Sequence, residues 1–232
     1  MPENGLSASE VGKEIAGQAK EAKANEERRD RVMAIVEASL LAVVAVLAAW
    51  SGYSSAKWST ESRLELSQAS AARTEASTHE LAAMTQRNFD SSTFTAWFVA
   101  WVAGDAEKMQ VAENRFTPNF RAAFEAWMAT NPETNPNAPP GPTYMPQYKQ
   151  PDAALATALN HKADLLYQQG STDGTQSDEY VRVTVYLATV LFLVAISGHF
   201  RIRGVRIGLI VVGGVMLAFS VSQLAVLPLP PA

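Results

Sequence analysis

The sequence predicts an all-α integral membrane protein that has three transmembrane helices and an extracytoplasmic helical bundle continuous with the first of them. Of the 232 residues, 47% are hydrophobic and 18% are charged, and the apolar excess lies in three stretches: Val32–Trp50, Val183–Phe200 and Ile207–Leu227. Such a composition excludes both a simple soluble domain and a largely disordered chain. No segment of strand length alternates apolar and polar residues, so the parts outside the membrane are expected to be helical as well.

The first transmembrane helix is expected at residues 31–53, after a charged cytoplasmic segment at residues 1–30. A hydrocarbon core takes about 20 apolar residues as a helix. This stretch contains one charge, Glu37, and ends in the aromatic residues Trp50 and Tyr53, which are typical of a membrane interface. A cleaved signal peptide is the alternative. It is disfavoured because the preceding polar segment is long and no small-x-small cleavage site follows.

The second and third transmembrane helices, at residues 180–200 and 207–227, form a predicted hairpin because only a basic loop at residues 201–206 separates them. A short extracytoplasmic tail at residues 228–232 follows. The positive-inside rule places the loop in the cytoplasm through three arginines. These topology anchors are Arg201, Arg203 and Arg206. Arginines just before the first span support the same orientation, which leaves residues 54–179 outside the cytoplasm.

A fourth apolar segment, Phe94–Ala103, tests this topology. It is about ten residues long, which is typical of a buried or interfacial helix rather than of a span. A fourth span would also move the basic loop out of the cytoplasm, against the positive-inside rule. The three-span arrangement is therefore favoured.

The extracytoplasmic region is expected to begin as a continuation of the first span, because no Gly or Pro occurs between Tyr53 and Gly104. This rod is predicted to end near Gln86. Mostly small residues at three- and four-residue spacing form a seam along it, which predicts tight packing against other helices. The seam positions are Leu66, Ala69, Ala72, Ala76, His79 and Ala83.

Further helices are expected to pack against the rod. Three are expected in turn. The first begins near Ser91 or Ser92, the second spans about Asp105–Asn114, and the third is capped by Thr117 with Pro118 as its first helical residue. A loop at residues 131–151 follows, because dense proline is incompatible with a helix interior. A last helix, Asp152–Gln169, is expected to be joined to the second span by a linker that contains Gly170 and Gly174.

Glu37 is the most informative residue of the spans, because an ionisable side chain inside a membrane helix is costly and is by default a functional candidate. Three interpretations are open: an ion pair with Arg201 or Arg203, a role in a pore or in proton transfer, and simple exposure at the interface. A channel would need a pore lined by polar residues of the spans. These residues are Glu37, Ser39, Ser220, Ser222 and Gln223.

The first and third spans carry small residues on one helical face, which lets helix backbones approach closely in lipid. The positions are Ala34, Ala38, Ala42, Ala45, Ala49 and Gly52 in the first span and Gly214 and Ala218 in the third. Packing within one chain is one interpretation. A homo-oligomer is the favoured one, because three spans leave some of this surface uncovered.

No catalytic residue, cofactor or metal site is expected. The chain has no cysteine, which excludes thiolate metal sites and cysteine nucleophiles, and its net charge of −4 argues against a nucleic-acid partner. Glu75 with His79, and His161 with Asp164, come nearest to a ligand set, but their spacing is not that of di-iron bundles. No phosphate-binding loop, nucleophile elbow or metalloprotease motif occurs.

Two motifs resemble those of a group of bacterial membrane proteins without an assigned activity. One is Trp-Ser-x-Tyr where the first span ends, Trp50–Tyr53, and the other is Tyr-Val-x-x-x-Val where the second span begins, Tyr180–Val185. The resemblance covers the first span with its extension and the terminal hairpin. It implies a bacterial cytoplasmic-membrane location and an intact three-span architecture, and it implies no activity.

Together these features predict a non-enzymatic bacterial inner-membrane protein. Its expected partners are the lipid bilayer, further copies of itself and an extracytoplasmic protein, and its extracytoplasmic module is expected to serve interaction, scaffolding or sensing. The alternative is an oligomeric channel for ions or small solutes, lined by the polar residues of the spans.

Overall fold

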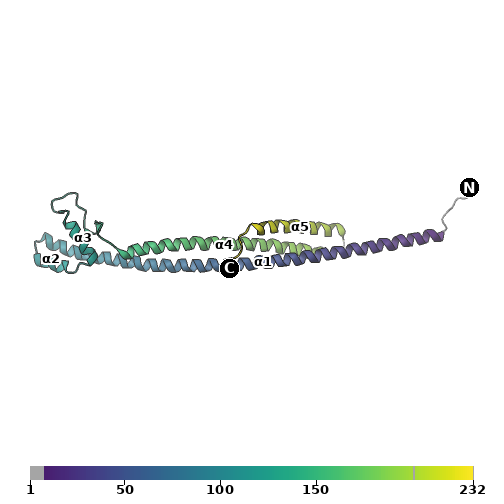
Figure 1. The fold of residues 1–232 in the computed structure, drawn as a ribbon, viewed down its shortest axis with the longest axis horizontal. Coiled ribbons are helices and arrows are strands. Elements are labelled where there is room, and N and C mark those ends of the chain that lie inside the picture. Colours follow the sequence, from purple (N-terminus) through teal and green to yellow (C-terminus); the bar gives the residue numbers. More distant parts are fainter. Residues whose placement is uncertain (1–7, 201, 232) are drawn as a thin grey trace. The chain divides into compact units, whose positions relative to one another are not determined.

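The computed structural model describes residues 8–200 and 202–231, and these residues are almost entirely helical (Figure 1). The elements are α1 (Ala8–Val102), α2 (Ala106–Glu113), α3 (Pro118–Met128), the 3₁₀ helix η1 (Pro142–Tyr144), α4 (Pro151–Ser197) and α5 (Arg203–Val226). No strand occurs in the described residues, which confirms the all-α prediction. Three of the helices, α1, α4 and α5, are long and apolar enough to cross a membrane.

The chain divides into two compact units. Unit 1 comprises Met1–Ser62 and Thr172–Ala232, and unit 2 comprises Arg63–Ser171. Helices α1 and α4 each contribute one part to either unit.

Helix α1 continues past Gln86 and Ser91 without a break, so the two helices expected on either side of this point are one. The segment contains no helix breaker, and Thr95 donates its hydroxyl to the Ser91 carbonyl inside the helix. The helix ends in a Schellman motif: Gly104 has a φ of +71°, and Asp105 N donates to the Ala100 carbonyl at 3.0 Å. Only glycine adopts this left-handed conformation without strain, so Gly104 determines where α1 stops.

Helix α4 likewise runs through the segment expected to be a linker between two helices. Gly170 and Gly174 are inside the helix rather than between two helices. A Cβ atom at Gly174 would lie 3.2 Å from the Ser62 hydroxyl, so the glycine lets α1 and α4 approach closely within unit 1. Gly174, which suggested a linker in the sequence, is therefore a site of contact between two helices.

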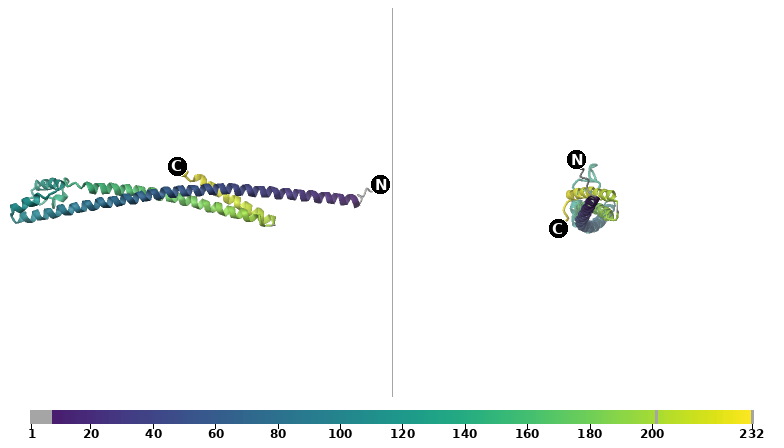
Figure 2. Two further views of the ribbon diagram at one scale, coloured as in Figure 1. Left: turned by 90° about the horizontal axis from the view of Figure 1, so that it is seen from below. Right: turned by 90° about the vertical axis from the view of Figure 1, so that its right-hand side faces the viewer.

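Unit 1 is built around α4. Its core consists of Val44 of α1 and of Val183, Leu187, Val190 and Val194 of α4. Helix α5 folds back beside the C-terminal part of α4 (Figure 2) and packs against this core through Met216 and Leu217. The two helices approach closely at Gly213, where a Cβ atom would lie 3.1 Å from Val194 Cγ2.

Unit 2 combines an alanine seam with an aromatic cluster. The predicted seam is confirmed, because Ala69, Ala72, Ala76 and Ala83 of α1 are buried, as are Ala156 and Ala163 of α4. At the far end of α1, the short helices α2 and α3 lie beside it and complete an aromatic cluster. Its buried members are Trp97, Ala112, Phe116, Phe120, Phe124 and Trp127.

The segment Phe94–Ala103 is the end of α1 and contributes to this cluster. Trp97 is only 1% exposed, and its ring lies 4.7 Å from that of Phe124. Phe94 packs edge-on against Trp127 at 5.3 Å. These contacts bury one face of the apolar segment, whereas Phe98, Val99 and Val102 are exposed. The proline-rich loop is held against the same cluster, because Trp127 Nε1 donates to the Pro139 carbonyl at 2.8 Å.

Candidate functional site

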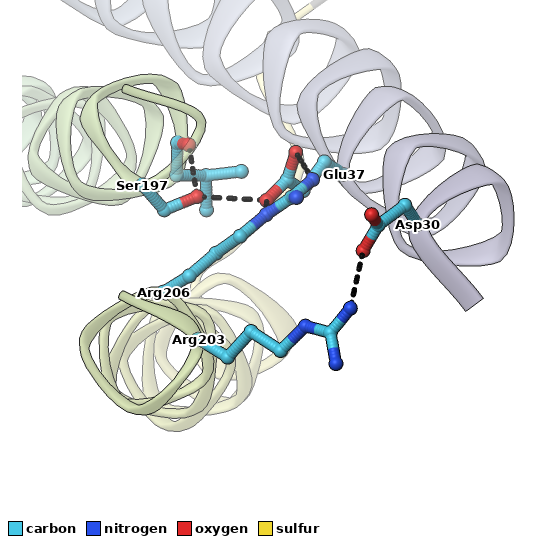
Figure 3. Close-up of polar contacts among 6 residues, drawn as sticks. Asp30, Glu37, Ser197, Arg203 and Arg206 are labelled. Atoms are coloured by element: carbon cyan, nitrogen blue, oxygen red, sulfur yellow. Dashed lines mark hydrogen bonds and ion pairs between the residues drawn. The ribbon is translucent and has the colours of Figure 1, made fainter. Parts of the chain in front are cut away.

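A polar junction formed by Glu37, Ser197 and Arg206 joins the three helices of unit 1 (Figure 3). Arg206 Nε donates to Glu37 Oε1 at 2.7 Å, and Arg206 Nη2 donates to Glu37 Oε2 at 2.8 Å. The Ser197 hydroxyl lies 3.0 Å from Glu37 Oε1. The Arg206 and Glu37 side chains are only 18% and 12% exposed, so this bidentate pair is largely shielded from solvent.

The partner of Glu37 differs from the expectation, which named Arg201 or Arg203. Arg201 lies outside the described residues. Arg203 lies 2.6 Å from Glu26 and 3.7 Å from Asp30. Figure 3 shows its guanidinium group turned toward Asp30. Because α5 already begins at Arg203, the residue one turn further along the helix, Arg206, reaches Glu37. Sequence spacing alone could not select among the three arginines, since that choice depends on where α5 starts.

A second set of polar contacts joins α1 and α4 near the end of the first apolar stretch. Ser51 donates its hydroxyl to the Tyr180 carbonyl at 2.9 Å, and the Ser55 and Ser177 hydroxyls lie 3.1 Å apart. The Tyr180 hydroxyl donates to the Pro228 carbonyl at 2.8 Å, which ties the end of α5 to α4. These serines were not predicted from the sequence. Ser51 and Ser55 nevertheless lie four residues apart on the same buried face of α1 as Val44.

The other polar residues predicted to line a pore do not converge within the chain. Ser220 is buried and donates to the Met216 carbonyl at 2.8 Å, whereas Ser222 is exposed and donates to the Phe219 carbonyl at 2.7 Å. Ser39 and Gln223 are exposed. Apart from Glu37 and Ser220, these side chains therefore face away from the core of unit 1.

The small-residue stripe of α1 is exposed along its whole length. Its members are Ala34, Ala38, Ala42, Ala45, Ala49 and Gly52. In α5, Gly214 is half-buried and Ala218 is exposed, while the neighbouring Gly213 makes the contact with α4. The close approach inside the chain thus uses a glycine that sequence analysis did not single out, and the predicted stripe is left free.

Unit 2 contains a buried carboxylate, Asp90, that organises its distal end. Asp90 Oδ1 accepts hydrogen bonds from Gln86 Nε2 at 3.0 Å and from the Thr117 hydroxyl at 2.8 Å. Asp90 Oδ2 accepts a hydrogen bond from the Tyr148 hydroxyl at 2.8 Å. The carboxylate is fully buried and borders a cavity of about 320 Å³. It thereby joins α1, the start of α3 and the proline-rich loop.

The four residues whose spacing came nearest to that of metal ligands, Glu75, His79, His161 and Asp164, do not form one cluster. His79 Nδ1 lies 2.7 Å from Asp152 Oδ1, and Arg73 pairs with Asp164 at 2.7 Å. Glu75 and His161 are exposed. Within the described residues no three His, Asp or Glu side chains are grouped so that they could hold a metal ion.

No protein-family model, curated protein or solved structure matches this chain.

The first prediction concerns the pair between Glu37 and Arg206. Either Glu37→Gln or Arg206→Gln leaves the other side chain largely shielded without its partner, and each is expected to lower the free energy of unfolding by about 3 kcal/mol. The double variant is expected to lose about 1–3 kcal/mol less than the sum of the two single variants. Unfolding of the purified protein in mixed micelles measures these values.

The exposed pair between Arg203 and Glu26 is the matched control. Its side chains are 49% and 57% exposed, so Glu26→Gln is expected to change stability by less than about 1 kcal/mol. Strictly additive effects of Glu37→Gln and Arg206→Gln would show that the pair does not couple α1 to α5.

The second prediction concerns pH and Tyr148. Burial, followed by the hydrogen bond to Asp90, raises the pKa of Tyr148 above its ordinary value near 10. The folded state holds the phenolic proton more tightly than the unfolded state does. Its contribution to stability is therefore complete below about pH 10 and is lost as the pH rises toward the raised pKa.

In denaturation experiments between about pH 9 and pH 11, the parent should lose stability more steeply than Tyr148→Phe, so that the difference between them shrinks as the pH rises. Tyr144→Phe is the control, because that side chain is 64% exposed. Parallel pH curves for the parent and Tyr148→Phe would contradict the role given to this hydrogen bond.

Proposed function

We propose that this chain is a non-enzymatic bacterial inner-membrane protein that self-assembles, and whose unit 2, outside the cytoplasm, scaffolds or docks a protein partner. The observation that carries the proposal is the junction, where the one carboxylate of the first apolar stretch is held by Arg206 and Ser197. A carboxylate engaged in this way is a structural contact between helices. The unit 1 helices then serve as an anchor rather than as the wall of a pore.

The channel alternative gains no support from the same geometry. A conducting path needs polar groups that face one water-filled axis, and a buried charge that is paired in a bidentate manner is already neutralised. Ser220 is engaged with its own helix backbone, and Ser222 and Gln223 are on the exposed side of α5.

The orientation is supported by contacts at one end of unit 1. Arg203 reaches Glu26 and Asp30, so the segment before the first apolar stretch and the start of α5 lie together. Both segments are rich in arginine, and the positive-inside rule places such segments in the cytoplasm. Unit 2, at the other end of the apolar stretch in sequence, is then extracytoplasmic.

Self-assembly is supported by the exposed alanine stripe of α1. In lipid, helices associate through close backbone packing at small residues, because lipid tails are as apolar as leucine. The chain's own helices leave this stripe uncovered. In a homo-oligomer, a helix of a second copy of the chain packs against this stripe.

A partner-binding role for unit 2 is supported by apolar side chains on the surface of α1. Leu81 is 66% exposed and Phe89 is 49% exposed, and both line an open groove beside Thr117. Exposed apolar surface of this kind, next to polar residues, is typical of a protein-binding site.

The third prediction tests the topology. Protease added to spheroplasts should cleave the proline-rich loop near Pro139–Pro142 and spare the N-terminal segment. The opposite pattern, with the loop protected and the N-terminal segment cut, would overturn the orientation and with it the extracytoplasmic role of unit 2.

The fourth prediction tests self-assembly. Ala42→Leu and Ala45→Leu keep the span apolar but separate closely packed helices, so each is expected to reduce the assembly mass measured by light scattering in mild detergent. Val46→Leu, on an exposed position outside the stripe, is the control. A monomeric parent would refute the oligomer, and ion flux in liposomes above that of empty vesicles would favour the channel.

A further inference from the structure

A groove of about 860 Å³ lies in unit 1 between the segment before the first apolar stretch and the start of α5. Its walls include the charged residues Arg28, Arg29 and Arg203 and the apolar residues Val32, Met33 and Ile207. Val32 and Met33 are at the start of the first apolar stretch, and Ile207 is at the start of the third. Cationic and apolar groups thus meet in one groove.

The three arginines of the groove differ in their partners. Arg203 is paired with Glu26 at 2.6 Å. It also lies 3.7 Å from Asp30, a contact that Figure 3 shows, and Asp30 is another residue that lines the groove. Arg28 and Arg29 are exposed and form no hydrogen bond or ion pair with any residue that the structure describes. Arg206, a turn further along α5, is engaged by Glu37. The cationic capacity of the groove therefore resides in Arg28 and Arg29.

We propose that this groove binds the headgroup of an anionic phospholipid, with Arg28 and Arg29 at the phosphate and Val32, Met33 and Ile207 at the first acyl carbons. The inference rests on the membrane placement given under the proposed function, which brings this groove to the cytoplasmic interface. Guanidinium groups bind phosphate oxygens in a bidentate manner, and basic pockets at this level of a membrane protein bind anionic headgroups.

A phospholipid fits better than a free phosphate because the apolar wall is part of the groove. Inorganic phosphate would use the arginines and leave Val32, Met33 and Ile207 without a contact. A phospholipid contacts both the arginines and the apolar wall, because its charged headgroup is directly joined to its apolar acyl chains.

The experiment measures lipid binding to the purified full-length protein in neutral detergent by native mass spectrometry. The probes are phosphatidylglycerol and phosphatidylcholine with identical acyl chains. The double variant Arg28→Gln/Arg29→Gln is expected to bind phosphatidylglycerol about 25-fold more weakly than the parent, because each surface arginine strengthens such binding about fivefold. Binding of phosphatidylcholine should be weak and equal in both proteins.

The matched control is Lys20→Gln/Lys23→Gln, which removes the same charge from exposed positions of α1 outside the groove. It is expected to bind phosphatidylglycerol within about threefold of the parent, since its charges lie further from the headgroup. Equal losses in the two double variants, or no loss in Arg28→Gln/Arg29→Gln, would overturn the inference. So would full displacement of phosphatidylglycerol by inorganic phosphate, which would indicate an anion site without a lipid requirement.

Carbonate extraction of membranes separates this inference from the proposed function. Release of the chain into the soluble fraction would overturn both. A chain that stays in the membrane pellet but shows no preference for phosphatidylglycerol would refute the groove alone.

Discussion

The bidentate contact between Arg206 and Glu37 is the constraint on which unit 1 depends. It joins α1 and α5 where both enter their apolar stretches, and Ser197 adds the end of α4 to the same carboxylate. A charge that is largely shielded from solvent is stable only with a partner, so this contact fixes the register of the three helices relative to one another. The valine and leucine core and the close approach at Gly213 follow from that register.

Unit 2 is held together by different means. Its long helices pack through alanines, which bury little area but allow close backbone contact, and its distal end is filled by tryptophan and phenylalanine rings. Asp90 supplies the polar counterpart, because it satisfies donors from three segments at once. Unit 2 is therefore stabilised by close helix packing, by aromatic contacts and by one shared carboxylate.

Four arginines of unit 1, on α1 and at the start of α5, differ in how they are paired with carboxylates. Arg206 is largely shielded from solvent and forms an ion pair with Glu37, and Arg203 forms exposed ion pairs with Glu26 and Asp30. Arg28 and Arg29 remain accessible. Arg203 and Arg206 are on α5 and reach carboxylates of α1, whereas Arg28 and Arg29 are on α1 and line the groove.

The sequence by itself determined the helical class, the three apolar stretches, the alanine seam and the starts of α2 and α3. Each of these depends on local periodicity, composition or a capping residue such as Asp105. The tertiary structure decided that Gly174 packs against Ser62, that Arg206 rather than Arg201 or Arg203 meets Glu37, and that Gly213 rather than Gly214 contacts α4. It also brought Asp90, Thr117 and Tyr148 together. These outcomes depend on which faces of separate helices meet, and one helical residue turns a face by about 100 degrees, so periodicity alone does not specify them.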